Sequence, residues 1–182
     1  ETDYVKHGGP EKLDEKVFEA MKLIQRPEQD KAELEDLAEE YDADIEAGTL
    51  AEGSYSHGEV MDNELVQKML RDHRAMKNQE KGYWTLGFDT EAVRKGVKKA
   101  YDLEEVDSVA LFTDGVSPAV ETYEMNGGRP YTAEEFLEKV EAEGVESVMD
   151  QIEGYEKDDQ NCERHVRFKT SDDKALTYIR FS

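Results

Sequence analysis

Apolar residues recur at helical spacing through the first part of the chain. The pattern predicts a helix that starts at Pro10 and is ended by Pro27, followed by helices over about 29–47 and 59–79. A glycine- and serine-rich stretch over 48–58 predicts a loop between the second and third helices. The residues that carry the three patterns are Leu13, Val17, Met21, Ile24, Leu34, Leu37, Tyr41, Ile45, Met61, Leu65, Met69 and Met76.

After the third helix the pattern changes to strands alternating with helices. Aromatic and β-branched residues lie between two glycines in Gly82–Gly87, so a strand is expected there. A short helix reaching about Tyr101 should follow, with Val93 and Val97 facing inward. Four consecutive apolar residues at 109–112, ended by Asp-Gly, predict a short buried strand.

The remaining residues predict helices and one closing strand. Thr132 and Glu135 have the spacing of a capping box, which predicts the start of a helix. Further helices are expected near 117–125 and 145–152, and a final strand from Leu176 to Phe181.

The order of these elements predicts an α/β or α+β fold, with helices packed against at least one face of a sheet. We expect a single domain over 1–182, mainly helical in 1–80 and containing strands with helices in 81–182.

Charge limits the classes of partner. The net charge is −22 over 182 residues, and charged residues make up 37% of the chain. So many carboxylates argue against direct binding to nucleic acid or to an anionic membrane. They favour a basic protein partner, a bound cation or solubility at high salt, and they also suit an acidic structural protein or a DNA mimic.

Cysteine content and hydropathy indicate a compartment. Cys162 is the only cysteine, so an intrachain disulfide is impossible and a reducing, cytoplasmic location is expected. The sequence contains no apolar run near the roughly 20 residues that span a bilayer, and no signal peptide is visible. The chain begins at Glu1 rather than Met, which suggests processing, truncation or a further upstream part.

The candidate chemistry lies at two strand ends. Asp114 directly follows the strand at 109–112, and Gly115 permits a sharp turn after it. Asp172 and Asp173 directly precede the closing strand. Carboxylates on neighbouring strand ends provide oxygen ligands for a hard cation such as Mg²⁺ or Mn²⁺.

Other catalytic arrangements have weaker support. Cys162 and His165 are close in sequence, but they lie in a polar loop without a third group to orient the imidazole. A phosphate-binding glycine loop, a zinc-protease motif and a paired-cysteine motif are absent from the sequence. His57 lies in the predicted loop, where a solvated side chain is expected.

Two segments, DSVALFTDGVS (Asp107–Ser117) and SDDKALTYIRF (Ser171–Phe181), contain the candidate aspartates next to a strand. They resemble, in this order, an aspartate motif in the second half of the domain of the PP2C-like (PPM-type) metal-dependent serine/threonine phosphatases and the closing strand of that domain. NQEKGYWTLGFD (Asn78–Asp89) is similar to a Gly-Tyr-Trp segment found in a bacterial subgroup. The order and spacing of the three segments match, and the resemblance covers about 80–182.

The resemblance implies an α-β-β-α sandwich and hydrolysis of phosphoserine or phosphothreonine in a phosphoprotein. It implies a two-metal Mn²⁺ or Mg²⁺ site in which Asp114 and Asp172 are metal ligands, while Asp173 occupies a position where the family has Asn or Asp. A metal-activated water would attack phosphorus.

The family's first half carries a bridging Asp-Gly and a phosphate-binding arginine that have no match here. Asp114-Gly115 is the only Asp-Gly in the sequence, and Lys174 stands where the family has a small residue. The chain therefore resembles the C-terminal portion of such a domain, whose missing N-terminal half would complete an otherwise incomplete metal site. The alternatives are a catalytically inactive PP2C-like acidic binding module and an acidic structural protein or DNA mimic.

Overall fold

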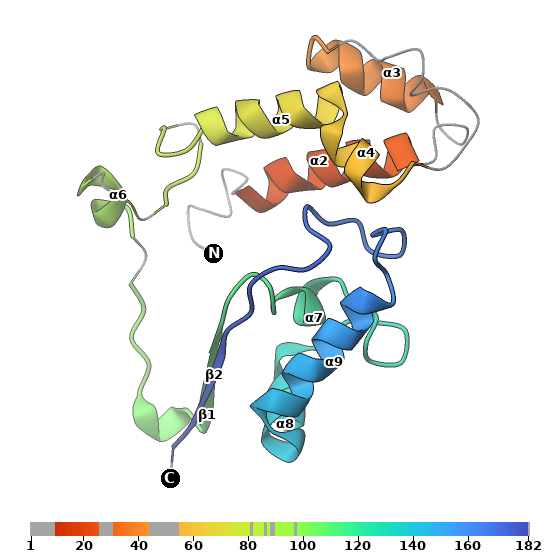
Figure 1. Ribbon diagram of the computed structural model, residues 1–182. Coiled ribbons are helices and arrows are strands. Elements are labelled where there is room, and N and C mark those ends of the chain that lie inside the picture. Colours follow the sequence, from red (N-terminus) through yellow and green to blue (C-terminus); the bar gives the residue numbers. More distant parts are fainter. Residues whose placement is uncertain are drawn as a thin grey trace. The chain divides into compact units, whose positions relative to one another are not determined.

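A computed structural model describes residues 10–25, 31–43, 55–80, 82–85, 87, 90–96 and 98–181. The chain divides into two compact units, Glu1–Lys99 and Ala100–Ser182 (Figure 1). Each unit has its own buried residues, and the two are described separately.

The first unit is helical in its described part. Its helices are α2 (Pro10–Gln25), α3 (Lys31–Glu40), α4 (His57–Asp62), α5 (Glu64–Ala75) and α6 (Thr90–Arg94). Helix α2 contacts α3, α4 and α5, so it lies at the centre of this packing. The buried apolar side chains of these four helices are Val17, Ala20, Met21, Ile24, Leu34, Ala38, Val60, Leu65, Val66, Met69 and Leu70.

The predicted third helix is two helices. Asn63 has extended backbone angles between α4 and α5, and its Oδ1 accepts a hydrogen bond of 3.0 Å from the Leu65 amide. An asparagine in this conformation caps a new helix rather than continuing the old one. His57, expected to be solvated, is the first residue of α4 and is buried.

The second helix ends earlier than predicted. It stops at Glu40, and Asp42 adopts a φ of 49° that interrupts helical geometry. The rest of the predicted helix, 44–47, lies outside the described residues.

The strand predicted at Gly82–Gly87 is wrong for the described residues of that segment. They form one isolated bridge, between Lys77 and Tyr83, and no ladder. Asn78 has a φ of 56°, and its Oδ1 accepts the Thr85 amide at 2.8 Å. The Thr85 amide is therefore bonded within the turn and cannot pair with a neighbouring strand. Leu86 lies outside the described residues.

Helix α6 also differs from the prediction. It ends at Arg94 rather than near Tyr101, and Val93, expected to face inward, is 59% exposed. Ala92 is the buried residue of this helix. Val97 lies outside the described residues.

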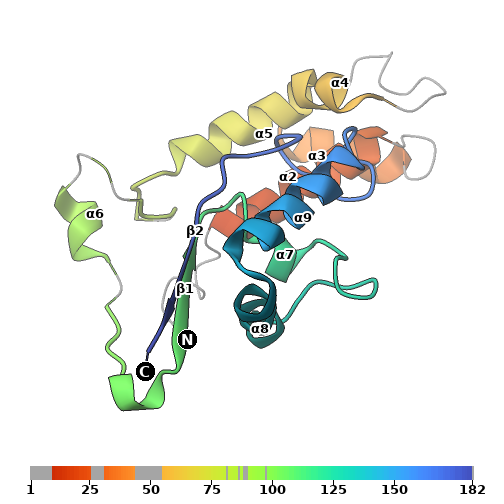
Figure 2. The ribbon, with the colours of Figure 1, turned by 60° about the horizontal axis from the view of Figure 1, so that its bottom comes forward.

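The second unit contains the sheet. Strands β1 (Ser108–Phe112) and β2 (Leu176–Arg180) pair antiparallel, with Ala110 opposite Tyr178, which confirms both predicted strands. Helices α8 (Ala133–Glu143) and α9 (Val145–Lys157) lie on one side of this pair (Figure 2). The fold is therefore α+β, with helices and a small antiparallel sheet.

Among the described residues of this unit, a helical layer covers one face of the sheet. The Phe112 ring meets the Phe136 ring of α8 at a centroid distance of 5.6 Å, and Leu176 and Tyr178 pack against the same core. Residues of the other face are open, with Leu111 62% exposed and Ile179 43% exposed. The prediction of a buried strand at 109–112 is wrong, because alternate side chains point away from the only helical layer described.

The helices of this unit follow their sequence signals. Thr132 and Glu135 form the predicted capping box of α8, and Gly144, with a φ of 86°, joins α8 to α9. The predicted helix at 117–125 is the single turn α7 (Pro118–Glu121). The buried residues of this core are Val116, Ala119, Tyr123, Phe136, Val140, Val148 and Ile152.

Candidate functional site

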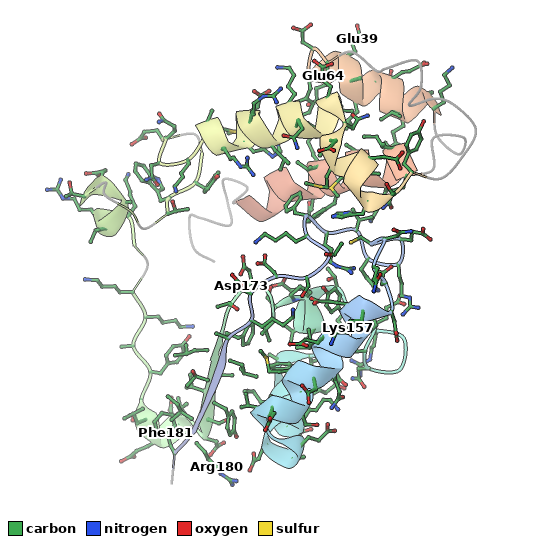
Figure 3. The ribbon with its side chains drawn as sticks, in the orientation of Figure 1. Glu39, Glu64, Lys157, Asp173, Arg180 and Phe181 are labelled. Atoms are coloured by element: carbon green, nitrogen blue, oxygen red, sulfur yellow. The ribbon has the colours of Figure 1, made fainter. Side chains whose placement is uncertain are left out.

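The two strand ends that carry the candidate carboxylates are neighbours. Because β1 and β2 are antiparallel, the end of β1 and the start of β2 lie together, with Asp173 at the start of β2 (Figure 3). Thr113 fastens them: its amide donates to the Ala175 carbonyl at 3.0 Å. Its hydroxyl donates to the Asp173 carbonyl at 3.1 Å and accepts from the Ala175 amide at 3.0 Å. Asp114 directly follows Thr113.

Gly115 lies against the backbone of the other strand. A Cβ atom on Gly115 would stand 2.4 Å from the Asp173 carbonyl oxygen, well inside van der Waals contact. The glycine therefore allows the two acidic segments to approach.

We expect Gly115→Ala to lower the free energy of unfolding by about 1–3 kcal/mol, because a backbone oxygen cannot rotate away from the added methyl group. Gly154→Ala is the matched control, since its Cβ would meet nothing within 4 Å in helix α9. That change should raise stability by about 0.5–1 kcal/mol. Urea unfolding followed by circular dichroism measures both, and equal effects would contradict the close approach.

Lys169 supplies a positive charge beside Asp172. Its Nζ lies 2.6 Å from Asp172 Oδ1, and that hydrogen bond raises the pKa of Lys169, helped by the charges of Asp172, Asp114 and Asp173. The same bond, together with one of 2.8 Å from the Asp173 amide, lowers the pKa of the Asp172 carboxyl. The fields of all three predicted carboxylates thus act on one ammonium group.

The donor atoms suit a hard cation, but the set is incomplete. Carboxylate oxygens are the ligands that Mg²⁺ and Mn²⁺ prefer. Among the residues that the structure describes, no three or more His, Cys, Asp or Glu side chains form a group able to hold a metal ion. Asp114 and Asp172 therefore fit as part of a coordination sphere, with Asp173 beside them, and their metal role stays a prediction.

Lys174, which the sequence places beside the acidic pair, has an internal partner. Its side chain is 5% exposed, and Nζ lies 2.7 Å from Oε2 of Glu156, itself 4% exposed. The second oxygen of Glu156 accepts the Tyr123 hydroxyl at 3.0 Å. Burial, followed by the charge of Glu156, raises the pKa of Tyr123, so the phenol stays a donor. Lys174 thus anchors the start of β2 to helix α9.

A second ion pair shapes the loop that leads to Asp172. Asp159 accepts the amides of Arg164 and His165 at 3.0 and 3.1 Å and the Arg167 guanidinium at 2.7 Å. Arg167 in turn donates to the Asp159 carbonyl at 2.6 Å and to the Thr170 carbonyl at 3.1 Å. The turn from α9 to the acidic segment is therefore set by hydrogen bonds, which is what a positioned carboxylate needs.

Cys162 and His165 do not form an activated nucleophile. Burial raises the pKa of the Cys162 thiol to about 11, which is opposite to the shift that a nucleophilic thiolate requires. Burial also lowers the pKa of His165, whose ring lies 5.6 Å from the Tyr123 ring and 5.5 Å from the Tyr155 ring, between centroids. Both side chains serve packing.

Sequence reasoning missed Lys169 and the Glu156–Lys174 pair. Lys169 stands three residues before Asp172, a spacing at which an ion pair is readily formed, so its signal was present. Glu156 carried none, because its position on α9 becomes internal only when β2 packs there.

Every helix in the described residues is too short or too polar to cross a bilayer.

Comparison with known proteins assigns no family to this chain. No protein-family model, curated protein or solved structure matches it.

Proposed function

We propose that this chain is the C-terminal part of a PP2C-like metal-dependent serine/threonine protein phosphatase domain, to which it contributes Asp114 and Asp172 as metal ligands. One observation carries the proposal: two acidic strand ends, linked by a hydrogen bond between Thr113 and Asp173 that are 60 residues apart, meet at one end of a sheet. Two strands with helices on one side also support the proposal, because an α-β-β-α sandwich contains a sheet with a helical layer on one face.

Each residue of the site has a distinct task in this proposal. Asp114 and Asp172 would hold Mn²⁺ or Mg²⁺, which supplies a water of lowered pKa and charge stabilisation for phosphoester hydrolysis. Lys169 forms an ion pair with Oδ1 of Asp172, so it holds that carboxylate ionised and oriented. A metal ion would have to compete with Lys169 for this oxygen. Asp173 joins the two strand ends through its backbone carbonyl. In this proposal the missing N-terminal half of the domain would supply the remaining ligands and the phosphate-binding arginine.

We expect Asp114→Asn and Asp172→Asn each to reduce Mn²⁺-dependent phosphate release from a phosphoserine peptide by about 100-fold or more in the full-length gene product. An amide cannot replace an anionic ligand, although it preserves the shape of the side chain. Asp150→Asn, on the exposed side of α9, is the control for lost acidity and should change nothing. Undiminished activity in Asp114→Asn would overturn the assignment.

The ion pair between Lys169 and Asp172 favours a second candidate, a catalytically inactive PP2C-like module that binds a basic protein. In that case the ammonium permanently occupies the place of a cation. Calorimetry separates the two: the inactive module gives no Mn²⁺ binding heat and associates with a basic protein in a salt-dependent way. Competition with DNA for a basic DNA-binding protein would instead identify a mimic.

A further inference from the structure

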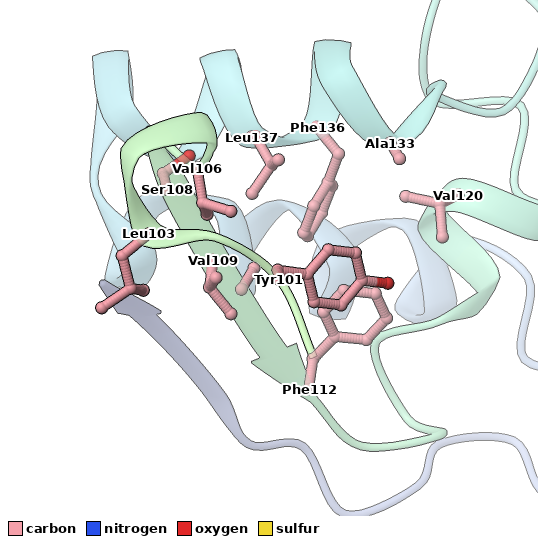
Figure 4. Close-up of a pocket in the computed structure, with 11 residues that line it drawn as sticks. Tyr101, Leu103, Val106, Ser108, Val109, Phe112, Val120, Ala133, Phe136 and Leu137 are labelled. Atoms are coloured by element: carbon pink, nitrogen blue, oxygen red, sulfur yellow. The ribbon is translucent and has the colours of Figure 1, made fainter. Parts of the chain in front are cut away.

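An apolar groove of about 590 Å³ runs beside β1 in the second unit (Figure 4). One wall is the segment around the single turn η2 (Leu103–Glu105), and the other is helix α8, which contributes Phe136 and Leu137. Its floor includes Ala110 and Phe112 of β1. Leu103 is 65% exposed, so the groove is lined by apolar side chains that solvent reaches.

The hydrogen-bonding groups of β1 that face away from β2 lie along this groove. The residues on either side of β1 bond to the residues on either side of β2: Thr113 N donates to Ala175 O, and Phe181 N donates to Asp107 O. Backbone groups alternate sides along an antiparallel strand, so those of Ser108, Ala110 and Phe112 point to the other edge. Within the described residues the sheet has two strands, and nothing pairs with that edge.

The rim of the groove is acidic. Four exposed acidic residues lie between or beside the wall residues Tyr101, Leu103 and Val106 in the sequence: Asp102, Glu104, Glu105 and Asp107. The sequence contains no Lys or Arg from residue 100 to 128. Carboxylates along an open edge select a cationic partner and repel a second copy of a chain whose net charge is −22.

We propose that the edge of β1 and this groove bind an extended segment of a partner protein in which basic and apolar residues alternate. The segment adds a third strand: its main chain pairs with Ser108, Ala110 and Phe112, its apolar side chains enter the groove, and its basic side chains meet the rim. A two-stranded sheet is marginal alone, so the added strand also completes the sheet. The inference does not depend on the proposed phosphatase function.

A short capped peptide of alternating lysine and valine is the probe, and hydrogen exchange of the full chain is the readout. We expect the amides of Ser108, Ala110 and Phe112 to exchange quickly in the free protein and to slow at least 10-fold with peptide. An alternating glutamate and valine peptide, which keeps the strand propensity and reverses the charge, should give no protection. Amides already protected in the free protein would overturn the proposal, because the edge would then be covered.

Two variants test edge pairing and charge separately. Ala110→Pro removes an outward N–H without removing a bond to β2, so peptide binding should weaken by 10-fold or more while the fold persists.

Glu104→Gln with Glu105→Gln should weaken binding several-fold at low salt and much less at high salt. Glu146→Gln with Asp150→Asn on α9 is the control for charge. Unchanged binding in the glutamine pair, or sedimentation showing self-association through this edge, would contradict the proposal.

Discussion

Replacing Lys174 by methionine is expected to lower the free energy of unfolding of the second unit by about 3–5 kcal/mol. The substitution keeps much of the volume of the side chain but removes the ammonium group from Glu156, whose carboxylate is 4% exposed. That carboxylate then keeps its hydrogen bond from the Tyr123 hydroxyl but has lost its counter-charge. An unpaired buried charge costs far more than the lost attraction of an exposed pair.

Lys157→Met is the matched control for this prediction. Lys157 pairs with Glu153 at 3.3 Å, but the two side chains are 71% and 50% exposed. Its loss should change stability by no more than about 1 kcal/mol. Tyrosine near-ultraviolet circular dichroism during urea unfolding measures both variants. Equal effects, or a loss below about 1 kcal/mol in Lys174→Met, would show that Glu156 reaches water in the folded protein.

Asp159→Asn is expected to destabilise the same unit by about 3 kcal/mol at neutral pH. An amide oxygen keeps some of the acceptor geometry but withdraws the negative charge from Arg167, whose side chain is 12% exposed. It also weakens the acceptor for the Arg164 and His165 amides. The turn that leads to Asp172 then loses the carboxylate to which three of its residues donate hydrogen bonds.

The effect of Asp159→Asn should depend on pH in a predictable direction. Burial alone would raise the pKa of Asp159, but the hydrogen bonds from Arg164, Arg167 and His165 outweigh it, so the folded-state pKa lies below the ordinary value. A lowered carboxyl pKa stabilises the fold above the unfolded-state pKa of about 3.9 and loses that contribution as pH falls through the folded-state pKa.

The difference between wild type and Asp159→Asn should therefore be largest at neutral pH and shrink as the pH falls below about 4. Unfolding free energies at several pH values measure it. Asp158→Asn, its exposed neighbour, is the control and should show no such convergence. If the difference in unfolding free energy were the same at every pH, the turn would be stabilised by hydrogen-bond geometry and not by the charge of Asp159.

Local signals were sufficient for most elements of the fold. The apolar run at 109–112 and the capping box at Thr132 identified β1 and α8, because their cues lie within a few residues. The strand prediction at Gly82–Gly87 was wrong because the strand propensity of this segment is outweighed by a turn. In that turn Asn78 Oδ1 accepts a hydrogen bond from the Thr85 amide. The exposure of Leu111 was also hidden, because the number of layers around a sheet is a property of the whole fold.

For the candidate site, the sequence predicted that acidic residues directly follow β1 and directly precede β2. The pairing of the strands makes the segments that carry Asp114 and Asp172 neighbours. The partners of those residues were not predictable. The contact of Lys174 with Glu156 depends on the packing of β2 against α9. The residues near either position in the sequence do not indicate that packing.

The turn held by Asp159 has a consequence for thiol chemistry. Cys162 lies inside it, with a φ of 52°, a fully buried side chain and an amide that donates to the Asp159 carbonyl at 3.0 Å. A buried thiol whose pKa is raised to about 11 stays protonated at neutral pH and is a poor target for oxidants and alkylating reagents. Oxidative damage at this cysteine therefore requires the turn to open first. The rate at which air oxidises this thiol therefore depends on how often the turn opens.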